Sequence, residues 1–153
     1  MSQQSKPANG WASVRFGMPQ QGAIGERSKD ISVADIELFS AMTGDRNPLH
    51  TDRKAAEASR FGGLVVQGGV TTGILNAVVA EELPGPGTVF LSVEWKFVKP
   101  VYVGDRITGR VTVTNVREDK PICTIETEVI NQHGETCLSG TAVTYTADLG
   151  PAS

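Results

Sequence analysis

The residues best suited to chemistry in this chain are Asp45 and His50, an aspartate and a histidine five positions apart. Both lie in the segment 43–50, which reads TGDRNPLH, where Pro48 disfavours helical backbone at the preceding residue. We therefore expect 45–50 to form a shaped loop after a helix, and catalytic groups concentrate on such loops. An aspartate and a histidine brought together can share a water, one accepting its proton while the other donates. A structural role, with Asp45 in a turn and His50 capping a helix, explains the pair equally simply.

A second candidate is the segment Gln67-Gly68-Gly69, directly before an apolar stretch. Glycine allows a ligand to approach the backbone closely. Free N–H groups at a helix N-terminus stabilise developing negative charge, as an oxyanion hole for a thioester enolate requires. A glycine-rich turn leading into a packed helix explains the same residues without any ligand.

Several functional classes are excluded by what the sequence lacks. No nucleotide-binding glycine motif, GxSxG elbow or HExxH occurs, and no Cys/His cluster has zinc spacing, so we expect no metal or redox cofactor. The net charge of −3, without a basic stripe interleaved with aromatics, argues against nucleic acid. The second histidine, His133, lies in a Gln-His-Gly sequence and is expected to be an exposed turn residue.

The expected cellular location is the cytoplasm. No apolar run is long enough to span a bilayer, and no charged-then-apolar leader opens the chain. Cys123 and Cys137 are expected to be buried free thiols, with a disulfide between them as the alternative.

Hydrophobic periodicity predicts the helices that would position the candidate site. A helix is expected from about residue 33 to 42, opened by the capping-box spacing of Ser32 and Asp35 and ended by Gly44. A short helix is expected over 53–60. The stretch 70–83 is apolar or small nearly all round, which predicts a buried helix.

The second half of the chain has the alternation of half-buried strands. We expect four, at about 89–97, 107–113, 122–130 and 137–147, with a hairpin turn at 131–134. One buried helix followed by antiparallel strands predicts an α+β fold with the sheet wrapped on the helix. We expect residues 1–20 to be partly loose, with Trp11, Val14 and Phe16 on a surface strand, and residues 21–150 to form a single domain.

Residues 39–50 (FSAMTGDRNPLH), followed by Ala55-Ala56, resemble the hydratase motif of the MaoC-like hydratase/dehydratase family. The resemblance continues through 61–68 (FGGLVVQG) and 97–105 (FVKPVYVGD) and covers about residues 30–147. It implies a hot-dog fold, in which a curved antiparallel sheet wraps a long central helix, and a homodimer or higher homo-oligomer with sheets joined edge to edge.

The activity implied by this resemblance is that of the (R)-specific enoyl-CoA hydratases of fatty acid metabolism. Water would add reversibly to a trans-2-enoyl thioester of coenzyme A or acyl carrier protein, giving the (R)-3-hydroxyacyl thioester. Asp45 and His50 fall on the family's catalytic pair. Gly68 falls on the glycine whose N–H faces the thioester carbonyl.

Three further positions are carried over as candidate substrate contacts: Asn47, Gln67 and Asn76. Gln67 stands where the family commonly has His, and glutamine cannot carry a proton at neutral pH. Asn76 stands within the buried helix where some hydratases have Ser, and a buried amide needs partners. These departures leave two alternatives open, a non-catalytic acyl-thioester binding module and a hot-dog thioesterase, although the intact Gly-Asp-x-Asn-Pro-x-His loop favours hydration.

Overall fold

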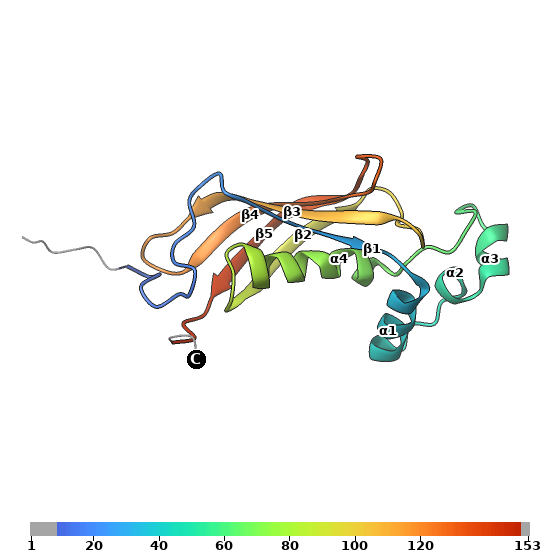
Figure 1. Cartoon of the computed structure of the whole chain (residues 1–153), viewed down its shortest axis with the longest axis horizontal. Helices are drawn as coiled ribbons and strands as arrows, with labels where there is room; N and C mark the ends of the chain where they lie inside the picture. Colours follow the sequence, from blue (N-terminus) through green and yellow to red (C-terminus); the bar gives the residue numbers. More distant parts are fainter. Residues whose placement is uncertain (1–8, 151–153) are drawn as a thin grey trace, which may run out of the picture.

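The computed structural model describes residues 9–150, in which an antiparallel sheet curves over a central helix (Figure 1). The strands are β1 (Ile24–Asp30), β2 (Thr88–Phe97), β3 (Arg106–Val116), β4 (Ile122–Ile130) and β5 (Thr136–Thr146). Their order across the sheet is β1-β3-β4-β5-β2, and all neighbours are antiparallel. The helices are α1 (Val33–Thr43), α2 (Pro48–Thr51), α3 (Arg53–Ala58) and α4 (Gly68–Ala77), which continues as the π-helical turn η1 (Val78–Glu82). The predicted hot-dog fold is confirmed.

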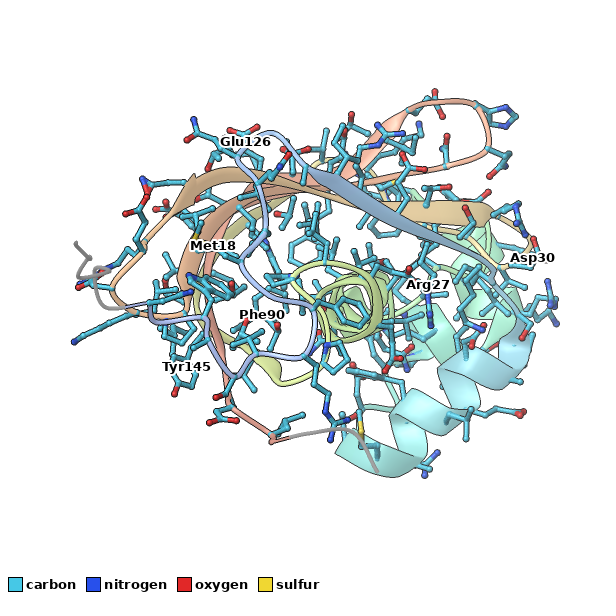
Figure 2. The ribbon with its side chains drawn as sticks, turned by 60° about the vertical axis from the view of Figure 1, so that its left-hand side comes forward. Met18, Arg27, Asp30, Phe90, Glu126 and Tyr145 are labelled. Atoms are coloured by element: carbon cyan, nitrogen blue, oxygen red, sulfur yellow. The ribbon has the colours of Figure 1, made fainter. Side chains whose placement is uncertain are left out.

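The core lies between α4 and the inner face of the sheet. On β4 the apolar side chains of Cys123, Ile125 and Val129 are buried against the helix. Figure 2 shows Phe90 on this inner side and Glu126 on the opposite side. In Figure 1, α1, α2 and α3 gather beyond one end of α4, so this end of the fold is where the candidate site is assembled.

The predicted start and end of α1 are confirmed. The Asp35 carboxylate accepts a hydrogen bond from the Ser32 backbone N–H at 2.9 Å and pairs with Lys29 Nζ at 3.0 Å. Burial raises the pKa of Asp35, but these partners outweigh it and the net pKa is lowered. At the other end, Gly44 adopts φ +85°, a left-handed conformation that favours glycine, and its N–H donates to the Ser40 carbonyl at 2.8 Å.

The expected loop over 45–50 is only partly correct. Pro48 begins α2, a four-residue helix that contains His50, and the Asn47 side chain caps it by accepting from the Leu49 N–H at 3.1 Å. Proline suits the first helical position because its fixed φ is helical and no N–H is needed there. Asp52, rather than His50, caps the next helix, α3.

Strand β2 does not have the simple alternation predicted for it. A bulge at Leu91 shifts the pairing with β5, so Phe90 lies on the inner face before the bulge and Val93, Trp95 and Phe97 lie on it afterwards. Val89, which simple alternation over 89–97 would place on that same face, instead pairs with Tyr145 on the outer face. One inserted residue moves every later side chain of the strand to the opposite face of the sheet. The hydrophobic pattern alone does not show where such a residue is inserted.

The central helix is not buried on all sides, which corrects the prediction for 70–83. Thr71, Ile74 and Leu75 are buried, the latter two against Gly109 of β3, whereas Gly73 and Asn76 are exposed. Asn76 is therefore not the buried amide that was expected.

The N-terminal segment contributes to the core. Within residues 9–20 the chain forms turns, so the surface strand expected at 11–16 was wrong; residues 1–8 lie outside the described part. Trp11 and Val14 are buried in the main cluster while Phe16 is exposed, and Trp11 Nε1 donates to the Arg117 carbonyl at 2.7 Å. The division of the chain at residue 20 stays a prediction.

Both cysteines are free and buried, as expected. Burial raises the pKa of the Cys123 thiol to about 11 and also raises that of Cys137. His133 is exposed in the β4–β5 turn, as predicted. Of the helices described between residues 9 and 150, none is both long and apolar enough to cross a membrane.

Candidate active site

The backbone around Asp45 is fixed by short-range hydrogen bonds. Its N–H donates to Thr43 Oγ1 at 3.1 Å, and its carbonyl accepts from Ser40 Oγ at 2.7 Å. One carboxylate oxygen, Oδ1, accepts from the Asn47 N–H at 3.1 Å in an Asx-type turn. The half-buried carboxylate is thus oriented before any ligand arrives.

His50 is oriented from the other side, by Val65. The ring nitrogen Nδ1 lies 2.6 Å from the Val65 carbonyl oxygen, and the Val65 N–H donates to the Leu49 carbonyl at 3.4 Å. No hydrogen bond joins His50 directly to Asp45 within the described chain. The structure places the two on one short segment, each with its own support.

Val65 is held by the strand-like stretch before α4. The Val66 N–H donates to the Val101 carbonyl at 2.9 Å, and Tyr102 Oη donates to the Phe61 carbonyl at 2.7 Å. These bonds connect residues 61–66 to the chain leading into β3. Because His50 is bonded to this stretch, the main fold restrains its ring.

Gly68 is the first residue of α4. It lies against the ring of Phe97, and the next residue, Gly69, lies against the ring of Phe39. A Cβ on Gly68 would come within 3.1 Å of the Phe97 ring, and a Cβ on Gly69 would overlap the Phe39 ring. Side chains at either position would displace these rings. The first N–H groups of a helix have no partner within it, so the bare backbone here is available to an anionic group.

His50 and Gly68 line the same cavity, of about 400 Å³. Its other walls are mainly apolar: Leu49, Phe61, Val65, Val66, Thr71, Phe97, Val98, Lys99, Pro100 and Val101. A volume in this range suits a small ligand with an apolar part. A second cavity of about 530 Å³ lies between α1, α4 and β1; Gly69 lines it, whereas Asp45, His50 and Gly68 do not.

Asp45 and the three candidate substrate contacts lie outside the cavity wall. Asn47 is exposed at the start of α2, and Asn76 is exposed on α4. Gln67 is buried, with its amide turned toward α1, where Nε2 donates to Ser40 Oγ at 3.0 Å. Substrate contact by these three residues stays a prediction.

Two supporting residues were not predicted from the sequence, Ser40 and Val65. Ser40 falls on the buried stripe of α1, four residues after Ile36, and a polar side chain at a core position requires a partner. That requirement could have identified Ser40. Val65 acts through its carbonyl, which no side-chain pattern reveals.

Comparison with known proteins gives consistent matches. The model of a family described as "MaoC like domain" matches residues 15–135. An (R)-specific enoyl-CoA hydratase of Aeromonas caviae is 37% identical over 116 residues, which are 76% of this chain and 87% of that protein. The solved structure of an (R)-hydratase from A. caviae superposes with a TM-score of 0.80 at 34% identity, covering 84% of this chain and 98% of that one. An unliganded R-hydratase from Pseudomonas aeruginosa gives a TM-score of 0.79 at 30% identity, covering 88% and 92%.

Proposed function

The chain belongs to the MaoC-like domain family, and we propose that it is a hydro-lyase that adds water reversibly to a trans-2-enoyl thioester. The product would be the (R)-3-hydroxyacyl thioester of coenzyme A or acyl carrier protein. The observation that carries this proposal is the single apolar cavity lined by both His50 and Gly68. A ligand in this cavity would meet both a proton-transfer group and a helix N-terminus.

The hydrogen bond from His50 to Val65 supports a particular role for the imidazole. A carbonyl oxygen can only accept, so Nδ1 carries the ring proton when His50 is neutral and Nε2 keeps its lone pair. Nε2 is the nitrogen that we propose accepts a proton from water. The bond to Val65 also holds the ring in one orientation.

Asp45 is proposed to orient the same water. Its Oδ1 is engaged by the Asn47 N–H, while Oδ2 accepts no hydrogen bond from any residue between 9 and 150. A carboxylate oxygen with free lone pairs can hold a water by accepting one of its protons in a hydrogen bond. In this proposal Asp45 and His50 act on the same water, Asp45 by holding it and His50 by accepting its proton.

Gly68 is proposed to bind the thioester carbonyl oxygen through its N–H. Electron density drawn onto that oxygen makes C3 electrophilic and stabilises the enolate that forms as water attacks. The hydroxyl bonds to C3, and the proton passes through the Asp45–His50 pair to C2. Both parts of the water are then in the product, and the pair ends the cycle as it began.

A panel of trans-2-enoyl-CoA thioesters of increasing chain length tests this function. We expect loss of the enoyl absorbance without release of free thiol, at rates that depend on chain length. Thiol release would indicate a thioesterase. Ligand-induced thermal stabilisation without turnover at any chain length would indicate a binding module.

We further propose a homodimer joined through β2. This strand is one edge of the sheet, and its inner-face side chains Val93 and Phe97 are 46% and 59% exposed. The opposite edge, β1, has the sequence IGERSKD, and charged side chains protect an edge strand from pairing. A second copy lying along β2 would satisfy its unpaired backbone and cover these apolar side chains.

The two free, buried thiols are what a reducing compartment maintains, so we place the protein in the cytoplasm.

Substituting Val93 by lysine is expected to produce a monomer. The ammonium group would lie within the proposed interface, where an unpaired charge is strongly unfavourable. Light scattering after size exclusion should give twice the 16.2 kDa chain mass for the native protein and the single mass for the variant. The matched control is Ile24→Lys on β1, an exposed apolar residue at the other edge, which should remain dimeric. A native monomer, or a dimeric Val93→Lys variant, would contradict this interface.

A further inference from the structure

Gln67 is buried between the two parts of the candidate site. Its side chain is 1% exposed, and Nε2 donates to Ser40 Oγ at 3.0 Å and to the Ile36 carbonyl at 3.4 Å. Ser40 Oγ in turn donates to the Asp45 carbonyl at 2.7 Å. A continuous chain of hydrogen bonds therefore joins the residue before Gly68 to the backbone of Asp45.

The direction of this hydrogen-bond chain is determined by its members. The Asp45 carbonyl can only accept, so the one hydroxyl proton of Ser40 is committed to it. Ser40 Oγ must then accept from Gln67, and the amide nitrogen is the only part of that side chain that can donate. The reversed amide would place Oε1 against the Ile36 carbonyl, with two acceptors facing one another. The network thus fixes which way the Gln67 amide points.

The stretch 65–68 is linked to each of the three proposed catalytic groups, either directly or through Ser40. The Val65 carbonyl holds His50, Gln67 reaches Asp45 through Ser40, and Gly68 offers the N–H for the thioester oxygen. We infer that Gln67 is a positioning residue, which holds Asp45 in register with Gly68. This inference rests on the proposed hydration and adds a residue to its machinery.

The other amide atom of Gln67 indicates that the side chain is not there for stability. Oε1 is buried and has no hydrogen-bond partner among residues 9–150. A buried acceptor without a partner is unfavourable for folding. Methionine has a similar length and no such acceptor, so Gln67→Met should retain or raise the melting temperature while releasing Ser40.

The expected result is a loss of turnover without a loss of stability. In enoyl-CoA hydration, Gln67→Met should lower kcat about 10-fold with KM changed less than about 2-fold, because misplaced catalytic groups weaken the transition state more than substrate binding. Ser40→Ala breaks the same chain and should lower kcat similarly. The double variant should be no slower than the slower single variant, since coupled residues are not additive.

The matched control is Thr144→Val on β5. Thr144 Oγ1 is also buried without a partner in the described chain, but it lies outside the cavity and the Asp45 segment. This variant should keep the native kcat. Hydrogen exchange followed by mass spectrometry should show faster exchange in residues 41–50 for Gln67→Met and Ser40→Ala, and no change for Thr144→Val.

Each outcome separates this inference from the function on which it rests. A native chain that does not hydrate enoyl thioesters would overturn both. An active native chain, with Gln67→Met at native kcat or with multiplying losses in the double variant, would overturn the positioning role alone. If Gln67→Met does not fold, Ser40→Ala decides, and its native kcat and unchanged exchange would overturn the inference.

Discussion

Asp45→Asn and His50→Ala are each expected to lower kcat for enoyl-thioester hydration by at least ~10²-fold, the lower range for losing an acid–base group. Asparagine can still accept the Asn47 N–H through its own Oδ1, so the turn is retained and only the carboxylate chemistry is lost. Alanine at 50 removes Nε2, the proposed proton acceptor. Steady-state hydration of crotonyl-CoA, followed by enoyl absorbance, gives both rates.

The control for these variants is His133→Ala. This is the second histidine of the chain, and it is exposed in the β4–β5 turn. It should leave kcat and KM at native values. Native rates in both Asp45→Asn and His50→Ala would remove these residues from the mechanism.

Trp11→Ala is expected to have the largest effect on stability, lowering the free energy of unfolding by about 3–5 kcal/mol. The indole is 2% exposed within the main core cluster, and truncation leaves a cavity that the surrounding residues fill only in part. It also leaves the Arg117 carbonyl without the donor that lies 2.7 Å away. Urea unfolding followed by circular dichroism measures the change.

Phe16→Ala is the matched control, because this nearby aromatic side chain is 58% exposed. Its effect should be within about 1 kcal/mol, since little apolar surface is returned to water. Trp11→Phe should lie between the two, as it keeps most of the packing but loses the hydrogen bond to Arg117. A Trp11→Ala variant as stable as Phe16→Ala would mean that the N-terminal turns do not belong to the folded core.

The parts of the fold predicted from the sequence are those specified by local patterns. The α1 helix follows from its apolar spacing, the Ser32–Asp35 cap and Gly44, all within a dozen residues of one another. The strands β3, β4 and β5 follow from alternation with one buried face. β1 was missed because it is an edge strand with charged residues and little apolar alternation.

The errors arise where distant segments decide the outcome. The bulge at Leu91 is set by pairing with β5, and the burial of Trp11 is set by the β3–β4 end of the sheet. The exposure of α4 at Asn76 depends on which other segments of the chain pack against that side of the helix. None of these features can be predicted from a local sequence pattern.

The candidate site shows the same division. The spacing of Asp45 and His50 made the pair a candidate, and the resemblance to the hydratase motif favoured it and added Gly68; these assignments stay predictions. The sequence did not reveal that Val65 and Ser40 support the pair, because one acts through its backbone and the other across 27 residues to Gln67. Support of this kind depends on contacts that form only in the fold.

The most direct test of the central claim is the configuration of the product formed from crotonyl-CoA by the native chain. After incubation, the 3-hydroxybutyryl-CoA is isolated with its thioester intact and analysed by chiral chromatography. Water held by Asp45 and His50 on one segment would attack from one face, and the similarity to (R)-specific hydratases makes the (R) product the expected one. Racemic or (S) product, or free coenzyme A with no hydroxyacyl thioester, would contradict the proposed hydratase.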